Sequence, residues 1–298
     1  MPIQQITIIG TGLIGGSLGL ALKSRSHPPR IVGCDCAEVL GRASQMGAID
    51  ESFLNPIQSC LGSQIVVLAL PVGGIIDLLE RLGPELSSEI LLTDVGSTKV
   101  QIVERAKAVF GKAAGDRFLP GHPMTGKELG GIDHADAHLF EGAAWLFTPI
   151  QPSTASGSAP MSLAEEFKQH VRSVGATAIT MSPERHDELC AWISHLPQMV
   201  STAMAGVLLD FRQGFSDHAN PDLDLSKIGG RALREMTRTA SSPYSMWRDI
   251  AFTNTANIEH ALLQLEHRLA HIRENLKTPE LRAEFENARN IAPQKLDQ

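Results

Sequence analysis

ITIIGTGLIGGSLGLAL, residues 6–22, is the stretch that decides how this chain folds. An apolar strand leads into three spaced glycines, and a run of small residues typical of a closely packed helix follows. Gly10 allows a tight turn, Gly12 lets the backbone approach a pyrophosphate, and Gly15 lets the helix lie close to the strand. The N-terminus of that helix offers unpaired N–H groups to phosphates. The stretch therefore predicts a Rossmann-type, dinucleotide-binding turn.

An acidic residue completes this pattern. Asp35 comes twenty residues after Gly15, at the end of a second apolar run, residues 31–34. A carboxylate at this point accepts hydrogen bonds from ribose hydroxyls and repels a 2′-phosphate, which favours NAD over NADP as the cofactor. The alternative, a glycine-rich turn in some other α/β protein, is disfavoured because the strand, the spacing and the acid occur together.

The same apolar stretch could also be interpreted as a signal peptide or a membrane span. No Lys or Arg precedes it, and five glycines interrupt it. A secretory signal has a basic start, and a spanning helix needs about 20 predominantly apolar residues. We therefore expect a soluble, cytoplasmic protein with no membrane partner.

The composition favours a globular protein of two domains. The chain has 298 residues, of which 43% are hydrophobic and 20% charged, so it can bury a sizeable core. A net charge of −7 without a basic run disfavours nucleic-acid binding. The four cysteines lack zinc-ligand spacing and are typical of reduced structural thiols, so no metal site is expected.

Strand and helix patterns alternate through residues 1–182, the expected first domain. Apolar runs at 64–70 and 90–94 are typical of buried parallel strands, and helical patterns lie between the strands. This rhythm indicates a doubly wound sheet. A helix and a strand at 163–181 are expected to add one more unit to the same sheet, with residues 151–160 as a surface loop.

The pattern then changes, and residues 183–298 are expected to form an all-α helical domain. Ser182 and Pro183 give a strong helix start, and the long helix that follows is expected to kink at Pro197. Apolar residues repeat at heptad a and d positions from 258 to 276. They form either a core-facing stripe or a helix–helix contact, and behind a dinucleotide-binding domain we expect a homodimer.

Polar residues after strands are the candidates for chemistry, because ligands of such sheets bind outside the carboxyl ends of the strands. Ser97 either caps the next helix or bonds a substrate hydroxyl. His122 is either a loop histidine that bonds backbone or an acid–base group. His186 falls in the first turn of its helix, where we expect it to be exposed, and His195 is either a core histidine or a substrate contact. Arg238 suits a substrate carboxylate, with an ion pair as the alternative.

Taken together, these segments resemble the prephenate/arogenate dehydrogenase family of tyrosine biosynthesis. The resemblance rests on IIGTGLIGGSL, LPV after a strand, DVGSTK, GHPMTGKELGG, HDELCAWISHLP and TRTASSPYSMWRDI, in this order. The glycine motif occurs in many oxidoreductases, whereas GHPMTGKE with ISHLP and TRTASSP is specific. The implied NAD contacts are Gly10, Gly12, Leu13, Ile14, Gly15, Asp35, Leu70, Pro71 and Val72.

The resemblance also implies roles for the polar residues. His122 is implied to be the catalytic histidine that bonds the ring 4-hydroxyl of the substrate, and Ser97 to orient that hydroxyl or the histidine. His195 is implied to line the substrate pocket. Arg238 is implied to hold a substrate carboxylate, and Glu128 to pair with this arginine and gate access.

Two further substrate contacts are expected, Thr125 within GHPMTGKE and Gln198 after Pro197. Some members of the family have SHLPH, so the second histidine of that motif is Gln198 in this chain. The difference removes a potentially cationic contact to a pyruvyl-type side chain. It leaves L-arogenate open as a substrate beside prephenate.

The implied reaction is the NAD-dependent oxidative decarboxylation of prephenate to 4-hydroxyphenylpyruvate, with hydride leaving ring C4 and His122 as acid/base. The alternatives are an arogenate dehydrogenase, which forms tyrosine, and a dual-specificity cyclohexadienyl dehydrogenase. A β-hydroxyacid dehydrogenase would need a catalytic lysine where the second domain has His186 and His195. A non-catalytic NAD-sensing protein is a further alternative, disfavoured because His122, Ser97 and Arg238 occur together.

Overall fold

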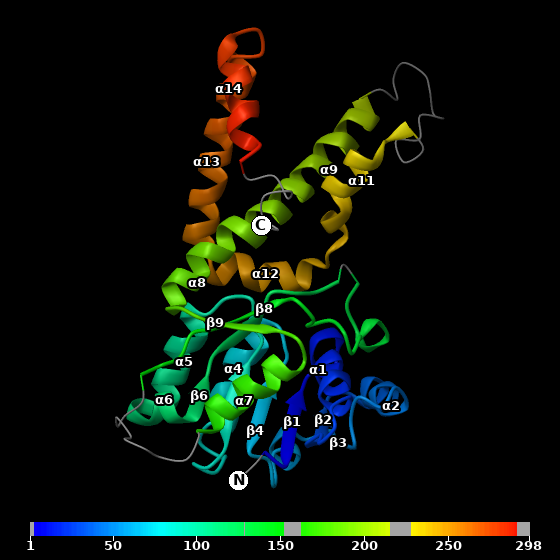
Figure 1. The fold of residues 1–298 in the computed structure, drawn as a ribbon, viewed down its shortest axis with the longest axis vertical. Helices are drawn as coiled ribbons and strands as arrows, with labels where there is room; N and C mark the ends of the chain where they lie inside the picture. Colours follow the sequence, from blue (N-terminus) through cyan, green and yellow to red (C-terminus); the bar gives the residue numbers. More distant parts are fainter. Residues whose placement is uncertain (1–2, 128, 152–161, 215–227, 291–298) are drawn as a thin grey trace.

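The computed structural model of the chain describes residues 3–127, 129–151, 162–214 and 228–290. They form an α/β domain that carries two arms of helices (Figure 1). Among these residues, no helix has both the length and the apolar character that crossing a bilayer requires.

A six-stranded, all-parallel sheet forms the centre of the α/β domain, in the order β3-β2-β1-β4-β5-β6. Its strands are β1 (Gln5–Ile9), β2 (Arg30–Cys34), β3 (Glu51–Phe53), β4 (Ile65–Leu68), β5 (Leu91–Asp94) and β6 (Phe118–Leu119). Every residue of β1 and β4 is buried, as parallel strands covered on both faces require. The strand order reverses between β1 and β4, and a ligand of such a sheet binds beside this switch point. The expected Rossmann-type architecture is confirmed.

Helices cover both faces of this sheet. They are α1 (Leu13–Lys23), α2 (Ala37–Gln45), α3 (Pro56–Ser59), α4 (Val72–Leu82), α5 (Val100–Phe110) and α6 (Ala114–Arg117). Alternate residues of β1 divide between two apolar cores: Ile6 and Ile8 pack with Leu18 and Leu22 of α1, whereas Ile9 belongs to the core that contains α4 and α5.

A second, three-stranded sheet lies beside the first. It has the order β7-β8-β9, with β7 (Gly121–Pro123) antiparallel to β8 (Ala144–Phe147) and β8 parallel to β9 (Thr177–Thr180). The expectation that residues 163–181 extend the main sheet was therefore wrong. Pro120 separates β6 from β7 and has no N–H with which to continue a ladder. The chain leaves the parallel sheet there, and β9 pairs with β8.

Helix α7 (Leu163–Ser173) covers the small sheet. The Phe167 ring packs edge-on against Trp145 and Phe147, with ring centroids 6.3 and 6.5 Å away. Apart from Gln151, the surface loop expected at 151–160 lies outside the described residues.

From residue 183 onward, the described part of the chain contains helices and no strand. The elements are α8 (Pro183–Cys190), a π-helical turn (Ala191–His195), α9 (Leu196–Gly214), α11 (Arg231–Thr237), a 3-10 turn (Arg238–Ser241), α12 (Tyr244–Thr253), α13 (Thr255–Glu274) and α14 (Pro279–Ala288). A π-helical turn interrupts the long helix and ends at His195, two residues before Pro197, which has no N–H to donate to the helical ladder. The kink expected at Pro197 stays a prediction. In Figure 1, α9 with α11 and α13 with α14 form the two arms, and α12 lies across the α/β domain.

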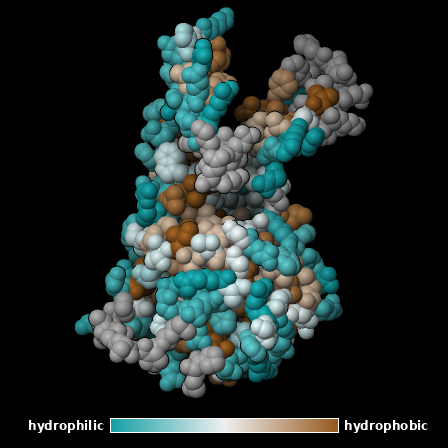
Figure 2. Space-filling view, viewed as in Figure 1, coloured by the Kyte–Doolittle hydropathy of each residue, from teal (hydrophilic) through white to brown (hydrophobic). Residues whose placement is uncertain are grey.

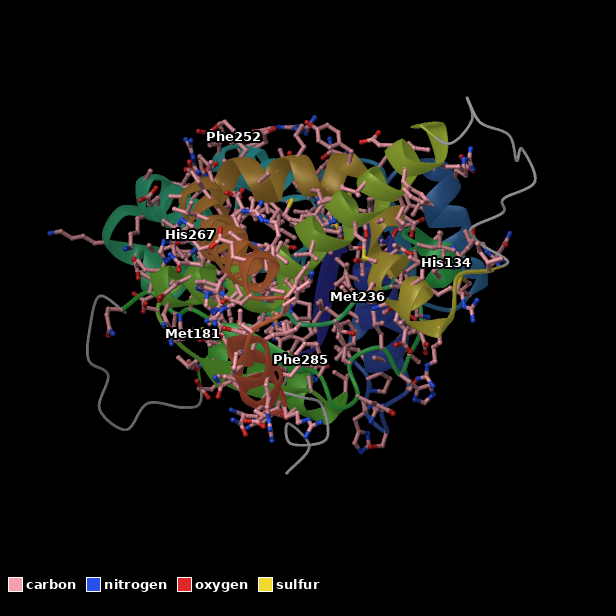
Figure 3. The ribbon with its side chains drawn as sticks, turned by 90° about the horizontal axis from the view of Figure 1, so that it is seen from above. His134, Met181, Met236, Phe252, His267 and Phe285 are labelled. Atoms are coloured by element: carbon pink, nitrogen blue, oxygen red, sulfur yellow. The ribbon has the colours of Figure 1, made fainter. Side chains whose placement is uncertain are left out.

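The heptad stripe of α13 serves different purposes along its length. At the inner end, Ile258 is buried against Ala191 and Ile250, whereas Leu269 toward the outer end is 55% exposed. Figure 2 shows further apolar atoms along the arms, and Figure 3 labels Met236 on α11 and Phe285 on α14, which are exposed. The stripe is core-facing at its base and leaves apolar surface on the arm.

Candidate active site

The glycine turn between β1 and α1 has the close contacts that its sequence predicts. Gly10 has a φ of +93°, and a Cβ built there would lie 2.3 Å from the Ala69 carbonyl oxygen. A Cβ on Gly15 would lie 1.9 Å from the Gly10 carbonyl oxygen. At Gly12, by contrast, no described atom lies within 4 Å of an added Cβ, and no side chain caps α1. The turn is packed against the protein and open at the helix start, where a phosphate would bind.

Asp35 and the segment after β4 lie against this turn. Asp35 Oδ2 accepts the Thr11 N–H at 2.8 Å, and Oδ1 accepts the Cys36 N–H at 2.7 Å. Leu70 Cδ2 would lie 2.9 Å from a Cβ on Gly10. The residues expected to contact a cofactor therefore come directly after three neighbouring parallel strands, β1, β2 and β4, at the carboxyl ends of these strands. They are Gly10, Gly12, Leu13, Ile14, Gly15, Asp35, Leu70, Pro71 and Val72.

His122 is a buried member of β7, with 8% of its surface exposed. Its Nδ1 lies 2.9 Å from Nε2 of His186 on α8, so it bonds a second imidazole. Burial, and then the neighbouring His186 and Lys99, hold the pKa of His122 well below its usual 6.5. The ring is therefore neutral at pH 7, and a neutral imidazole can accept a proton.

Two buried charges fix the backbone beside His122. Lys99 Nζ forms an ion pair with Asp94 and donates a hydrogen bond to the Gly121 carbonyl oxygen at 2.8 Å. Asp94 Oδ1 accepts the N–H of the same glycine at 3.1 Å. Because Gly121 immediately precedes His122, the ion pair holds the start of β7 against the end of β5.

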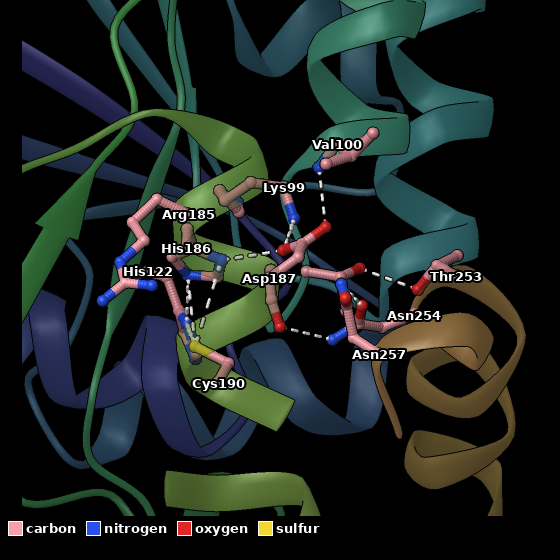
Figure 4. A network of polar contacts seen from close by, with 12 residues as sticks. Lys99, Val100, His122, Arg185, His186, Asp187, Cys190, Thr253, Asn254 and Asn257 are labelled. Atoms are coloured by element: carbon pink, nitrogen blue, oxygen red, sulfur yellow. Dashed lines mark hydrogen bonds and ion pairs between the residues drawn. The ribbon is translucent and has the colours of Figure 1, made fainter. Parts of the chain in front are cut away.

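His186 is fully buried, so the exposed position expected for it was wrong. Its Nδ1 lies 2.8 Å from Asp187 Oδ1 (Figure 4). The same carboxylate accepts the peptide N–H groups of Lys99 at 2.7 Å and Val100 at 2.9 Å. These groups begin α5, where helical N–H groups lack partners within the helix. Ser97 is therefore not the cap of α5, because Asp187 from the helical domain occupies that role and draws the first turn of α8 inward.

His195, in the π-helical turn, is also buried. Asn254 Nδ2 lies 3.2 Å from His195 Nδ1 and donates to the Asp187 carbonyl oxygen at 2.8 Å. The amide is fixed because Asn254 Oδ1 accepts from Asn257. His195 Nδ1 is therefore an acceptor, and Nε2 carries the ring proton. Burial lowers the pKa of His195 to about 4, and its Nε2 has no hydrogen-bond partner among the described residues.

Gln198 connects α9 to the segment that begins with Arg238. Its Nε2 donates to the Thr239 carbonyl oxygen at 2.9 Å and to Thr202 Oγ1 at 3.2 Å. Arg238 is exposed at the start of the 3-10 turn. Gln198, one of the residues predicted to contact the substrate, is thus bonded to the residue directly after Arg238, which is another.

The remaining residues predicted for the site are Thr125, Ser97 and Glu128. Thr125 Oγ1 donates to the Leu139 carbonyl oxygen at 3.0 Å. Ser97 is half-buried in the loop between β5 and α5. Glu128 lies outside the described residues.

Cys190 gives the histidine pair a sulfur neighbour. Its Sγ lies 3.6 Å from His186 Nε2 and 4.0 Å from His122 Nδ1, so in the described part of the chain three atoms of metal-ligand type lie within 4.8 Å. The two ring nitrogens already bond each other, however, and burial raises the pKa of Cys190 to about 12. The three side chains therefore form a buried hydrogen-bonded cluster.

Sequence reasoning missed Lys99, Asp187 and Asn254, and it misplaced His186. One signal was available: His186 and Cys190 are four residues apart and therefore share a helix face. The partners of Asp187 come from distant segments, which no local pattern indicates.

Comparison with known proteins agrees with this geometry. "Prephenate dehydrogenase, nucleotide-binding domain" matches residues 18–174, and "Prephenate dehydrogenase, dimerization domain" matches residues 182–288. The chain belongs to the prephenate dehydrogenase family. Prephenate dehydrogenase of Bacillus subtilis is 33% identical over 257 residues, which are 86% of this chain and 65% of that protein. The chain therefore spans about two thirds of the length of this relative.

Two solved structures share the fold over nearly the whole chain. The Aquifex aeolicus prephenate dehydrogenase, in complex with hydroxyphenyl propionate and NAD+, has a TM-score of 0.82 at 27% identity, and the match covers 100% of this chain and 99% of that one. Synechocystis arogenate dehydrogenase has a TM-score of 0.73 at 25% identity, over 97% of this chain and 99% of that one.

Proposed function

We propose that this member of the prephenate dehydrogenase family catalyses the NAD-dependent oxidative decarboxylation of prephenate to 4-hydroxyphenylpyruvate. The observation that carries the proposal is His122, a buried imidazole whose pKa is lowered by burial. It lies in β7, directly after β6, and β6 belongs to the same parallel sheet as β1, which the glycine turn follows. The A. aeolicus relative, crystallised with NAD+ and hydroxyphenyl propionate, supports a ring-bearing substrate.

The glycine turn fits a dinucleotide. Gly12 leaves the start of α1 open, so the helix N-terminus can hold the pyrophosphate, and Asp35 can accept ribose hydroxyls. When bound, NAD+ supplies a hydride acceptor for ring C4 of the substrate. Leu70, Pro71 and Val72 border the turn on the side of β4.

His122 acts as the acid–base group. It accepts the proton of the ring 4-hydroxyl as hydride leaves the same carbon, and Ser97 orients this hydroxyl. Loss of carbon dioxide then gives an aromatic phenol. Because aromatisation drives the step, the chain has to orient the substrate, accept one proton and hold charge.

The substrate side is assigned to the helical domain and the loop after β7. His195 donates to the substrate its buried Nε2–H, which has no partner in the described part of the chain, and Arg238 holds a carboxylate bidentately. Thr125, Gln198 and Glu128 are assigned to the same pocket.

L-Arogenate is the second candidate substrate, and Gln198 favours it. A neutral amide that already donates to Thr239 and Thr202 offers no positive charge to a pyruvyl carboxylate. The likeness to Synechocystis arogenate dehydrogenase supports this alternative. A dual-specificity cyclohexadienyl dehydrogenase would accept both compounds.

We further propose two domains, residues 1–182 and 183–298, and a homodimer formed through the helical domain. The "dimerization domain" match supports the dimer, as do the exposed apolar side chains Val207, Leu209, Phe211, Met236, Leu263, Leu269 and Phe285. Light scattering of the protein as it elutes from a size-exclusion column measures the oligomeric state.

A cytoplasmic location stays a prediction, supported by four free cysteines.

The activity is tested with purified protein, NAD+ and either prephenate or arogenate, by following NADH. Faster NADH formation with prephenate supports the main proposal, and faster formation with arogenate supports the second. No NADH with either compound, together with NAD binding in a calorimetric titration, would favour the non-catalytic NAD-sensing alternative.

A further inference from the structure

We propose that His186 and Asp187 are positioning residues that fix the tautomer of His122, so that its Nε2 is the proton acceptor. The inference deepens the proposed function and rests on it. It starts from a chain of short contacts: His122 Nδ1 to His186 Nε2 at 2.9 Å, His186 Nδ1 to Asp187 Oδ1 at 2.8 Å, and the Asp187 carboxylate to the start of α5.

The direction of each hydrogen bond follows from its fixed end. A carboxylate can only accept, and that of Asp187 already accepts two peptide N–H groups. The His186 Nδ1 must therefore carry the proton of the second contact. Burial lowers the pKa of His186 below 6.5, so this ring is neutral and has one proton. Its Nε2 consequently offers a lone pair.

The same reasoning then sets His122. Its Nδ1 faces the lone pair of His186 Nε2 at 2.9 Å, so Nδ1 must donate. Because His122 is also neutral, its other nitrogen, Nε2, holds the free lone pair. Without the chain, the two tautomers of His122 would compete, and the tautomer with the proton on Nε2 cannot accept a proton there.

The groups around His122 make its protonation depend strongly on His186 and Asp187. The charged or titratable groups around His122 are His186 and Cys190 on α8, Lys99 before α5, and His195 in the π-helical turn. Of these, His186, Lys99 and His195 all oppose a positive charge on His122. The proton that His122 gains in the reaction is therefore stabilised through its Nδ1–H bond to His186 and, one step further, by the Asp187 carboxylate. The arrangement has the same logic as a catalytic triad, in which a carboxylate fixes an imidazole tautomer.

The experiment uses three variants of the whole protein. His186→Leu removes the acceptor for His122 Nδ1–H. His186→Gln keeps an amide oxygen that can accept that proton and an amide N–H that can donate to Asp187. Glu188→Ala, on the exposed face of the same helix, is the control.

The first readout is the tautomer, measured by ¹⁵N NMR of histidine-labelled protein, with His122 assigned from the spectrum of His122→Asn. In the wild type and in Glu188→Ala we expect the His122 proton on Nδ1, and in His186→Leu a mixture of tautomers. An Nε2-protonated His122 in the wild type would overturn the inference, even if His186→Leu failed to fold.

The second readout is steady-state kinetics with the better substrate. His186→Leu should lower kcat by about 10²–10⁴-fold, the loss that a wrong imidazole tautomer causes, with the KM for NAD+ unchanged. His186→Gln should recover most of kcat, and Glu188→Ala should match the wild type. A leucine variant with full kcat would refute the positioning role. If the wild-type protein oxidises neither substrate, the proposed function fails, while the NMR result still decides the tautomer.

Discussion

The Asp187 carboxylate on α8 accepts the peptide N–H of Lys99 at 2.7 Å, across 88 residues of sequence. This bond joins the helical domain to the start of α5 in the α/β domain. The same carboxylate bonds His186, which in turn bonds His122. One side chain therefore contributes both to the contact between the domains and to the alignment of the histidine expected to react.

Replacing Asp187 should destabilise the fold. Asp187→Ala leaves the N–H groups of Lys99 and Val100 without their acceptor and removes the cap of α5, which should lower the free energy of unfolding by about 2–4 kcal/mol. Urea unfolding measures the change. The control is Glu188→Ala, whose exposed ion pair with Arg185 should contribute less than about 1 kcal/mol. Equal stability of both variants would contradict the capping role.

Removing His122 should affect turnover and leave cofactor binding intact. His122→Asn should lower kcat by about 10²–10⁴-fold because the proton acceptor is lost, while the dissociation constant for NAD+ stays the same. NADH formation and a calorimetric titration check the two parts. His267→Asn, an exposed histidine on α13 (Figure 3), serves as the control. Undiminished turnover in His122→Asn would remove this residue from the mechanism.

The free energy of unfolding should decrease as the pH is lowered below about 6.5, because the buried histidines bind protons less readily in the folded chain than in the unfolded chain. The pKa of His122, His186 and His195 is depressed, for His195 from 6.5 to about 4. A depressed pKa contributes stability above the unfolded value of 6.5, and this contribution is lost as pH falls toward the folded value. For His195 alone, the full difference corresponds to about 3 kcal/mol. Urea unfolding between pH 7.5 and 4.5 measures the slope, which His195→Asn should reduce; an unchanged slope would contradict the assignment.

The preference for NAD should depend on Asp35. Asp35→Ser removes the carboxylate that accepts ribose hydroxyls and repels a 2′-phosphate, so the ratio of kcat/KM for NAD+ over NADP+ should fall. Glu38→Ser, an exposed acid at the start of α2, should leave the ratio unchanged. If the ratio is the same in Asp35→Ser, this residue does not contact the ribose.

Arg238 should act on substrate binding. Arg238→Gln loses charge-assisted hydrogen bonds to a carboxylate, which should raise the substrate KM by an amount equivalent to about 1.5–3 kcal/mol, with a smaller effect on kcat. Arg234→Gln, one helical turn earlier and exposed, is the matched control. An unchanged KM would show that Arg238 has a structural role only.

Much of this molecule could be predicted from short segments. The glycine turn, the buried parallel strands and the start of α8 each depend on residues within one stretch, because a positive φ, apolar burial and helix capping are local requirements. The family motifs likewise pointed to His122, which is buried as a neutral imidazole. These features were enough to predict the fold class and the end of the sheet at which the cofactor is expected to bind.

Sequence by itself thus determined the local elements and the residue types near the site. Only the tertiary structure decided that β9 pairs with β8 in a separate sheet, that His186 is buried, and that Asp187 caps α5. Each of these depends on partners far apart in sequence: the His122–His186 bond spans 64 residues, and the Asp187–Lys99 bond spans 88. A helix pattern states which face a side chain occupies, but its burial and its protonation depend on which distant element packs against that face.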